Sequence, residues 1–345
     1  MGRRVLVTGV DTFWGGRLAQ ALERDSDFDV ILGMGTKEPQ LQLERAEFVR
    51  SDQAYSILSR IVKATQVDTV MHTFVVTNST QASSRALHET NVIGTMNLLA
   101  ACGQSGSRVR QVAVKSSAIV YGATENDPCW FREESTRSKP PHFRLERSLM
   151  DVERLVQDFA EDNPATVVSM IRCANVLGGD IQTTNSHNLA STFCPAILGF
   201  DPLVQFVEEA DVVRCLLHLT ENRIPGLYNL AGDAKIPWSE VMAICGTKPL
   251  YMPAYGTTQI ASTLVRLGLI KYAPELDELL RYGRGIDTSR IKQTGFECLY
   301  STAATVHKFI RAVRLRRNIG REQNSYTFEQ DVEQFFRHSP AVVRT

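Results

Sequence analysis

The amino-acid sequence predicts an α/β fold, a doubly wound parallel sheet followed by a smaller C-terminal lobe. Short apolar runs alternate with stretches of helical spacing through the first half of the 345 residues. Such alternation is typical of strand–helix–strand units, which assemble into a parallel sheet. The pattern becomes irregular after residue 180, and a second, smaller unit is therefore expected there.

The first predicted element is a buried strand over residues 5–8, which ends at Gly9 and leads into a helix beginning near Gly15. A glycine turn in this position lets backbone N–H groups and the helix N-terminus approach the pyrophosphate of a dinucleotide. The same reading predicts strands over residues 28–34, 47–50, 67–75, 112–117, 167–172 and 226–232, and helices beginning near 55 and covering 84–104 and 145–160.

Composition limits the functions that the chain can have. Lys and Arg together number 38, as do Asp and Glu, so no basic surface for nucleic acid is expected. Seven scattered cysteines without a Cys-x-x-Cys pair favour a reducing, cytoplasmic location and no metal site. Apolar runs are too short to span a bilayer, and the first strand begins too early for a signal peptide. We therefore expect neither stable membrane insertion nor secretion.

Four segments resemble one protein family in their order and spacing. The turn that begins at Gly9 is similar to a Thr-Gly-x-x-Gly-x-x-Gly motif, with Thr12 at its second glycine. Residues 67–75 form a strand containing His72, and 89–99 read Glu-Thr-Asn-Val-Ile-Gly-Thr-Met-Asn-Leu-Leu. Residues 112–122 end in Ser-Ser-Ala-Ile-Val-Tyr-Gly. Over roughly residues 3–180, the sequence resembles the NAD-dependent epimerase/dehydratase family of extended short-chain dehydrogenases/reductases.

This resemblance implies a Rossmann-like sheet, a bound NAD or NADP, and a polar or sugar-like small-molecule substrate. It also implies a homodimer through the helices 84–104 and 145–160. The cofactor contacts that it implies are Gly9, Thr12, Phe13, Trp14, Gly15, Thr36, Lys37, Asp52, Thr73 and Asn91. Two of these have structural alternatives, since Asp52 could cap the next helix and Asn91 could bond backbone across the sheet. We expect His72 to be a buried structural group.

The end of the second strand bears on the choice of cofactor. Family members that bind NAD carry an acidic residue there, which holds the adenosine ribose hydroxyls. Here Gly35 and Thr36 are followed by Lys37. A cation beside a missing acid favours NADP by a small margin, and both cofactors stay open.

The catalytic residues depart from the family pattern. Ser117 lies at the position of the family's catalytic Ser or Thr, where it would hydrogen-bond a substrate oxygen. The expected Tyr-x-x-x-Lys is missing: one register places Leu145 and Leu149 there, and a register shifted by two places Phe143 and Arg147. Neither pair supplies both the phenol and the ammonium that share the proton transfer.

Three other groups could replace the missing pair. His142 has a suitable ordinary pKa, Tyr121 supplies a phenol, and Lys115 lies on the same side of its strand as Ser117 because strand side chains alternate. Each also has a structural alternative, in a loop, in the core or beside the strand. The sequence does not choose among them.

The substrate side is expected in the C-terminal lobe. We place the dinucleotide-binding domain at residues 1–179 with 212–232 returning to it, the substrate lobe at 180–211 and 233–325, and a tail at 326–345. The resemblance assigns Asn175 to the substrate, and Arg281 or Arg284 could face a substrate anion. Val204 replaces an Arg that meets a diphosphate in the family. The basic stretch 313–321 could touch an anionic surface or form a solvated helix face.

Two functions therefore stay open. The first is an atypical NAD(P)-dependent epimerase, dehydratase or oxidoreductase in which Ser117 orients the substrate and another group carries the proton. The second is a catalytically silent relative that binds a dinucleotide and acts as a sensor or interaction protein.

Overall fold

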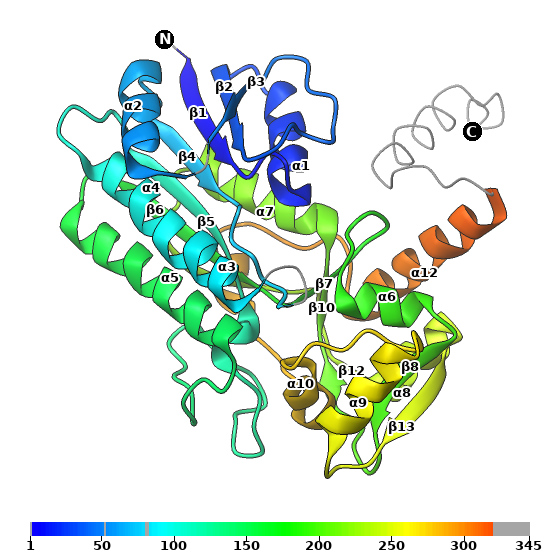
Figure 1. Ribbon diagram of the computed structural model, residues 1–345. Helices are drawn as coiled ribbons and strands as arrows, with labels where there is room; N and C mark the ends of the chain where they lie inside the picture. The colour runs from blue at the N-terminus through cyan, green and yellow to red at the C-terminus, as the bar shows by residue number, and fades with distance from the viewer. Residues whose placement is uncertain (1, 52, 80–82, 320–345) are drawn as a thin grey trace.

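A computed structural model describes residues 2–51, 53–79 and 83–319. Its centre is a seven-stranded parallel sheet in the order β11-β6-β5-β4-β1-β2-β3 (Figure 1). The strands are β1 (Arg3–Thr8), β2 (Phe28–Gly35), β3 (Glu47–Arg50), β4 (Thr69–His72), β5 (Gln111–Ser117), β6 (Val167–Cys173) and β11 (Gly226–Leu230). The strand order reverses between β1 and β4, and the crevice at such a point is where open α/β sheets bind ligands. The predicted fold class is confirmed.

Helices cover both faces of this sheet. On one face α1 (Phe13–Glu23) packs with α7 (Glu209–Glu221), over a core that includes Val5, Leu18 and Leu216. On the other face lie α2 (Tyr55–Thr65), α4 (Gly94–Gly103) and α5 (Arg144–Asp162), over a second core that includes Leu58 and Leu98. Central strands buried on both faces explain the almost continuous apolar runs of the sequence.

The helix predicted over 84–104 contains a local irregularity. It consists of α3 (Ser84–His88), a π-helical turn η1 (Glu89–Ile93) and α4. Asn91 lies in that turn with its side chain fully buried. Its amide accepts the N–H of Val76 at 2.8 Å and donates to the Val76 carbonyl at 2.9 Å. The widened turn therefore ties this helix to the strand end beside the crevice.

A smaller group of elements lies below the carboxyl ends of the sheet strands (Figure 1). Its pieces are β7 (Asn175–Leu177) paired with β10 (Phe206–Glu208), β9 (Leu203–Val204) with β12 (Ile236–Pro237), and β8 (Phe193–Ile197) with β13 (Lys248–Met252). The helices are α6 (Thr184–Ala190), α8 (Trp238–Cys245), α9 (Thr257–Arg266), α10 (Leu276–Tyr282) and α12 (Thr302–Ile319). A core around the fully buried Trp238 holds these pieces together.

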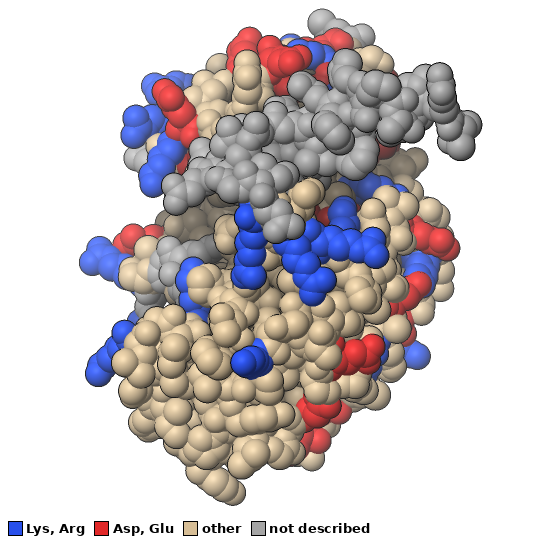
Figure 2. Space-filling view, turned by 90° about the vertical axis from the view of Figure 1, so that its right-hand side faces the viewer, with Lys and Arg blue, Asp and Glu red and all other residues tan. Residues whose placement is uncertain are grey.

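One part of the predicted substrate lobe belongs with the sheet instead. The short helix α11 (Ser289–Lys292) packs on β11, and Ile291 and Phe296 enter the same core as Val5 and Leu216. Residues 320–345, which include the predicted tail and the end of the basic stretch, lie outside the described residues. Figure 2 shows one face of the molecule, whose lower part carries few Lys, Arg, Asp or Glu side chains. The exposed apolar side chains of the smaller lobe include Leu198, Tyr251, Tyr255 and Leu267. Within the described ranges, no helix is both long and apolar enough to cross a membrane.

Candidate active site

The turn between β1 and α1 is shaped by two glycines. Gly9 has φ +70°, and a Cβ there would lie 2.8 Å from Phe74 Cα. A Cβ on Gly15 would overlap the carbonyl group of Gly9. Thr12, at the position of the family's second glycine, is the N-cap of α1: its Oγ1 donates to the Gly9 carbonyl at 2.6 Å and accepts from Gly15 N at 3.4 Å. The Thr12 hydroxyl is therefore turned back onto the turn, which keeps its tight form.

A cavity of about 490 Å³ extends from this turn across the ends of β4 and β5 to β7 and α6. Its size lies within the range of small-molecule sites. The predicted site residues that line it are Thr12, Phe13, Trp14, Thr73, Ser117 and Asn175. The remaining predicted residues lie outside its lining: Gly9, Gly15, Thr36, Lys37, Asn91 and Arg281. Asp52 is outside the described residues.

The carboxylate of Asp11 occupies the end of β2. Asp11 Oδ2 accepts the N–H of Thr36 at 2.9 Å, the hydroxyl of Thr36 at 2.9 Å and the N–H of Lys37 at 3.1 Å. Asp11 also lines the cavity. The sequence predicts no acid at this strand end, because Asp11 comes from the preceding turn, 24 residues before Gly35 in the chain. Its approach is close enough that a Cβ on Gly35 would lie 2.6 Å from Asp11 Oδ1.

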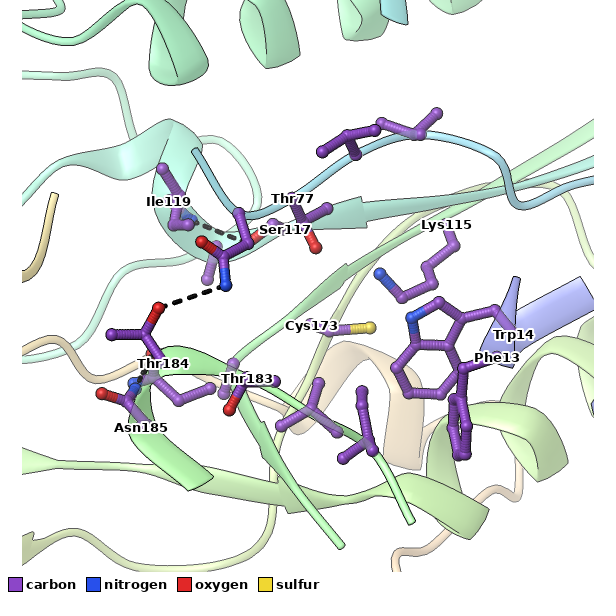
Figure 3. A pocket seen from close by; sticks show the side chains of 18 of the residues that line it. Phe13, Trp14, Thr77, Lys115, Ser117, Ile119, Cys173, Thr183, Thr184 and Asn185 are labelled. Atoms are coloured by element: carbon purple, nitrogen blue, oxygen red, sulfur yellow. Dashed lines mark hydrogen bonds between the residues drawn. The ribbon is translucent and has the colours of Figure 1, made fainter. Parts of the chain in front are cut away.

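Strand β5 brings two polar groups into the cavity. Ser117 Oγ accepts the N–H of Ile119 at 3.3 Å, and the Lys115 side chain enters between Trp14 and Cys173 (Figure 3). Ser116 points to the opposite face, where its hydroxyl donates to Glu153 at 2.5 Å. Lys115 and Ser117 therefore lie on one side of β5 and the Ser116 side chain on the other, as strand alternation predicts.

Lys115 is only 2% exposed. Among the described residues its Nζ makes no hydrogen bond or ion pair, and it lies 4.9 Å from the centre of the Trp14 ring. Burial lowers the pKa of this ammonium, with a smaller opposing effect from Cys173. A desolvated cation–π contact is worth about 2 kcal/mol, whereas removing an ammonium from water costs several kcal/mol. The unprotonated amine is therefore favoured here more than at a surface lysine.

Helix α5 presents no catalytic group to the cavity. Leu145 and Leu149 are 1% and 0% exposed and pack in the core with Val152. Phe143 is the residue before the helix, and Arg147 is exposed. None of these four residues lines the cavity. Neither register therefore places a proton-transfer pair at this site.

The other predicted substitutes lie elsewhere. Tyr121 is buried, its hydroxyl donates to Asn229 at 2.8 Å and accepts from Arg172 at 2.7 Å, and burial raises its pKa. His142 is exposed and outside the cavity lining. His72 is fully buried between the Thr8 and Thr95 hydroxyls at 3.1 and 2.9 Å, and burial lowers its pKa to about 3. A neutral His72 with both ring nitrogens hydrogen-bonded fits the predicted structural role.

The two arginines predicted to face a substrate anion, Arg281 and Arg284, lie in different surroundings. Arg281 is tied inside the smaller lobe, where it donates to Asp277 at 2.8 Å, to Ala254 O at 2.7 Å and to Thr257 at 2.8 Å. A substrate contact for Arg281 therefore has no support in the geometry. Arg284 instead lines the cavity, and its Nε donates to the Gly122 carbonyl at 2.6 Å. Burial lowers the pKa of Arg284 to about 10.

The opposite wall is held by charged groups. Asp180 lines the cavity and pairs with Arg17 of α1 and Arg316 of α12. Part of the basic stretch is therefore used within the molecule. Glu209 accepts the N–H of Asp180 at 3.1 Å and of Ile181 at 2.8 Å, and burial followed by the Asp180 charge raises its pKa to about 8. Among the described residues, no group of three or more His, Cys, Asp or Glu side chains is arranged to hold a metal ion.

Comparison with known proteins agrees with this architecture. The model of the NAD dependent epimerase/dehydratase family matches residues 5–231. The chain belongs to this family. An uncharacterized protein of Mycobacterium tuberculosis (strain ATCC 25618 / H37Rv) is 29% identical over 313 residues, which cover 89% of this chain and 83% of that protein.

Solved structures share the fold at low identity. MoeE5 in complex with UDP-glucose and NAD has a TM-score of 0.69 at 20% identity, covering 92% of this chain and 99% of that one. The dTDP-glucose 4,6-dehydratase of Streptomyces venezuelae with NAD bound has a TM-score of 0.69 at 19% identity, and the match covers 92% of this chain and 98% of that one. The UDP-glucose 4-epimerase of Thermotoga maritima has a TM-score of 0.69 at 17% identity, and the match covers 91% of this chain and 99% of that one. The first two of these structures contain NAD.

Proposed function

We propose that this family member binds a nicotinamide dinucleotide across the Gly9–Gly15 turn and acts on a sugar-nucleotide-like or other polar small molecule in the adjoining cavity. The observation that carries the proposal is the continuity of the cavity, from Asp11–Trp14 past Ser117 to Asn175 and Thr184. The dinucleotide would contact polar side chains at the Asp11–Trp14 end of the cavity, and the substrate would contact those at the Asn175 and Thr184 end. When bound, the dinucleotide supplies hydride chemistry.

The residues of the turn fit a dinucleotide. The first turn of α1 contains no acidic residue, so no carboxylate of the helix itself opposes the positive end of its dipole, which favours an anionic group. The Thr12 side chain is folded onto the Gly9 carbonyl, which leaves the backbone of the turn beside the cavity. Ser117 would donate its hydroxyl hydrogen to a substrate oxygen, and Asn175 would bind further along the ligand.

We further propose NAD as the cofactor, in place of the small preference for NADP that the sequence suggests. Asp11 supplies at the β2 end the acid that the strand itself lacks. A carboxylate there accepts hydrogen bonds from ribose hydroxyls, and it repels the 2′-phosphate of NADP. Lys37 contributes its backbone N–H to Asp11, and its exposed side chain does not line the cavity.

The test is a titration of the purified protein with NAD, NADH, NADP and NADPH, followed by thermal melting, because a ligand of the folded state raises the melting midpoint. We expect NAD or NADH to bind at least tenfold more tightly than the phosphorylated forms. Asp11→Asn should narrow that difference, and the matched variant Lys37→Ala should leave it unchanged. NADP binding as tight as that of NAD would contradict the assignment of NAD as the cofactor. Loss of NADP binding in Lys37→Ala would also contradict it.

A catalytically silent dinucleotide-binding sensor is the second candidate. It is favoured by Leu145 and Leu149, which fill the expected catalytic positions with core side chains. Dinucleotide binding together with no conversion of UDP- or dTDP-sugar substrates, measured by chromatography of the sugar nucleotides and by cofactor absorbance, would favour this candidate. Turnover that is lost in Ser117→Ala would favour the enzyme.

We also propose the homodimer that family resemblance implies, through α3–α4 and α5. Ile93 and Met96 are large apolar side chains that are 39% and 44% exposed on this surface, and adjoining exposed apolar side chains are typical of protein interfaces. Ile93→Glu combined with Met96→Glu should shift the protein to a monomer in analytical ultracentrifugation. A monomeric wild-type protein would contradict the dimer.

A further inference from the structure

The Lys115 amine lies at the reacting end of the cavity without a role in the function proposed above. Figure 3 shows its Nζ pointing into the open space between the Trp14 ring, Cys173 and Ser117. The side chain is 98% buried, since only 2% of it is exposed. It lies at the carboxyl end of the central strand β5, where open α/β sheets bind ligands.

The surroundings of the buried Lys115 differ from those of the ion-paired lysines. Lys139, Lys292 and Lys308 pair with Glu125, Asp233 and Glu208 at 2.7, 2.6 and 2.8 Å, respectively. No described carboxylate pairs with Lys115, and the Cys173 thiol and the Ser117 hydroxyl line the same cavity. Burial without a counter-charge favours the neutral amine, and the neutral amine is the form that attacks a carbonyl carbon.

Ser117 completes a small constellation with this amine. It lies two residues further along β5 and lines the same cavity. Its Oγ accepts the Ile119 N–H at 3.3 Å, and among the described residues no acceptor takes its hydroxyl hydrogen. This hydrogen can bond a carbonyl oxygen whose carbon faces Lys115.

We propose that Lys115 forms an imine with the carbonyl group of a small polyhydroxylated aldehyde or ketone held in this cavity. Nζ adds to the carbonyl carbon to give a carbinolamine, and Ser117 hydrogen-bonds the oxygen on that carbon. The oxygen then leaves as water with the two hydrogens of the amine, and the C=N bond forms. No oxidant or reductant is consumed. Hydroxyl and amide groups of Thr183, Thr184 and Asn175 line the far side and suit a ligand rich in hydroxyl groups.

Imine trapping in the intact protein tests this proposal directly. The protein is incubated at pH 7 with glycolaldehyde and cyanoborohydride, which reduces an imine to a stable secondary amine, and the labelled lysines are mapped by peptide mass spectrometry. We expect Lys115 to be labelled at least tenfold faster than the exposed Lys63 and the ion-paired Lys139. Ser117→Ala should slow labelling of Lys115 without changing that of Lys63. Lys63→Arg is the matched control and should leave Lys115 labelling unchanged.

Labelling of Lys115 no faster than that of Lys63, in protein with an unaltered melting curve, would overturn the proposal. The wild-type map decides this even where a Lys115 variant fails to fold. The titration with the four dinucleotides separates this inference from the proposed function. Fast Lys115 labelling in protein whose melting midpoint is raised by none of the four would contradict the proposed dinucleotide site and would leave the imine site supported.

Discussion

The β1–α1 turn and helix α5 differ from the family pattern to different extents. On the β1–α1 side, Gly9 and Gly15 keep the dinucleotide turn, and Thr12 closes it through its own hydroxyl. On the α5 side, Leu145 and Leu149 have become part of the hydrophobic core. The turn depends on backbone geometry that few residues can adopt, whereas α5 needs only an apolar inward face. The difference shows that the fold can keep the tight glycine turn without a Tyr/Lys pair on α5.

The largest expected effect is at the turn. Gly15→Ala places a methyl group against the Gly9 carbonyl, and backbone cannot move aside as a flexible side chain can. We expect a loss of about 3 kcal/mol or more in the free energy of unfolding, measured by urea denaturation. Gly106→Ala is the matched control, because no atom lies within 4 Å of its Cβ and only its φ of +84° opposes the change. That variant should lose about 1–2 kcal/mol. Equal losses would mean that the turn is less constrained than its contacts indicate.

On the α5 side, Leu149→Ala should destabilise by about 2–5 kcal/mol, because the side chain is fully buried and its removal leaves a cavity. The melting shift produced by NAD should stay the same, since Leu149 does not line the binding cavity. Leu155→Ala, at a half-buried position of the same helix, should cost less. A lost NAD response in folded Leu149→Ala protein would show that α5 still serves the site directly.

The burial of Lys115 without a counter-charge is expected to lower the free energy of unfolding, unlike the burial of Leu149. Lys115→Met removes a buried, unpaired ammonium at similar length, and we expect a gain of about 1–2 kcal/mol at pH 7. The pKa of Lys115 is lowered in the folded protein, so the unfolded chain binds the proton more strongly. Wild-type stability therefore falls as the pH drops below the unfolded-state lysine pKa of about 10.4.

The gain from Lys115→Met should accordingly shrink as the pH rises and vanish near pH 11, where both states hold the neutral amine. Denaturant melts at pH 7, 9 and 11 measure this trend. Lys115→Arg keeps the charge and should destabilise at every pH. A Met variant less stable than wild type at pH 7 would reveal a stabilising partner for the ammonium.

The smallest effect concerns Thr12. Thr12→Ala removes the N-cap of α1 and should cost about 1 kcal/mol, whereas Thr12→Gly should cost only a few tenths. Thr12→Gly also restores the family's second glycine, so NAD should bind it at least as tightly as wild type in calorimetry. Weaker NAD binding in Thr12→Gly would mean that the threonine hydroxyl contacts the cofactor.

Local sequence predicted the frame of the molecule well. The strand periods and the Gly9 turn are local properties, set by side-chain burial and by backbone freedom at single residues. Ser117 is the last residue of β5 and Asn175 comes two residues after β6, so their place at the cavity could also be predicted. By contrast, the wide turn around Asn91 and the return of Ile291 and Phe296 to the sheet depend on contacts between distant segments.

By itself, the sequence determined the α/β class, the family and the absence of a Tyr/Lys pair on α5, because each can be read from residues close together in the chain. Only the tertiary structure decided which charged groups lie at the cavity. Asp11 reaches the end of β2 from another turn, Arg281 is tied within the smaller lobe while Arg284 meets the cavity, and Lys115 is buried without a counter-charge. Charge and hydrogen bonding depend on which segments meet in space, and a residue's chemistry at a site is set by those neighbours.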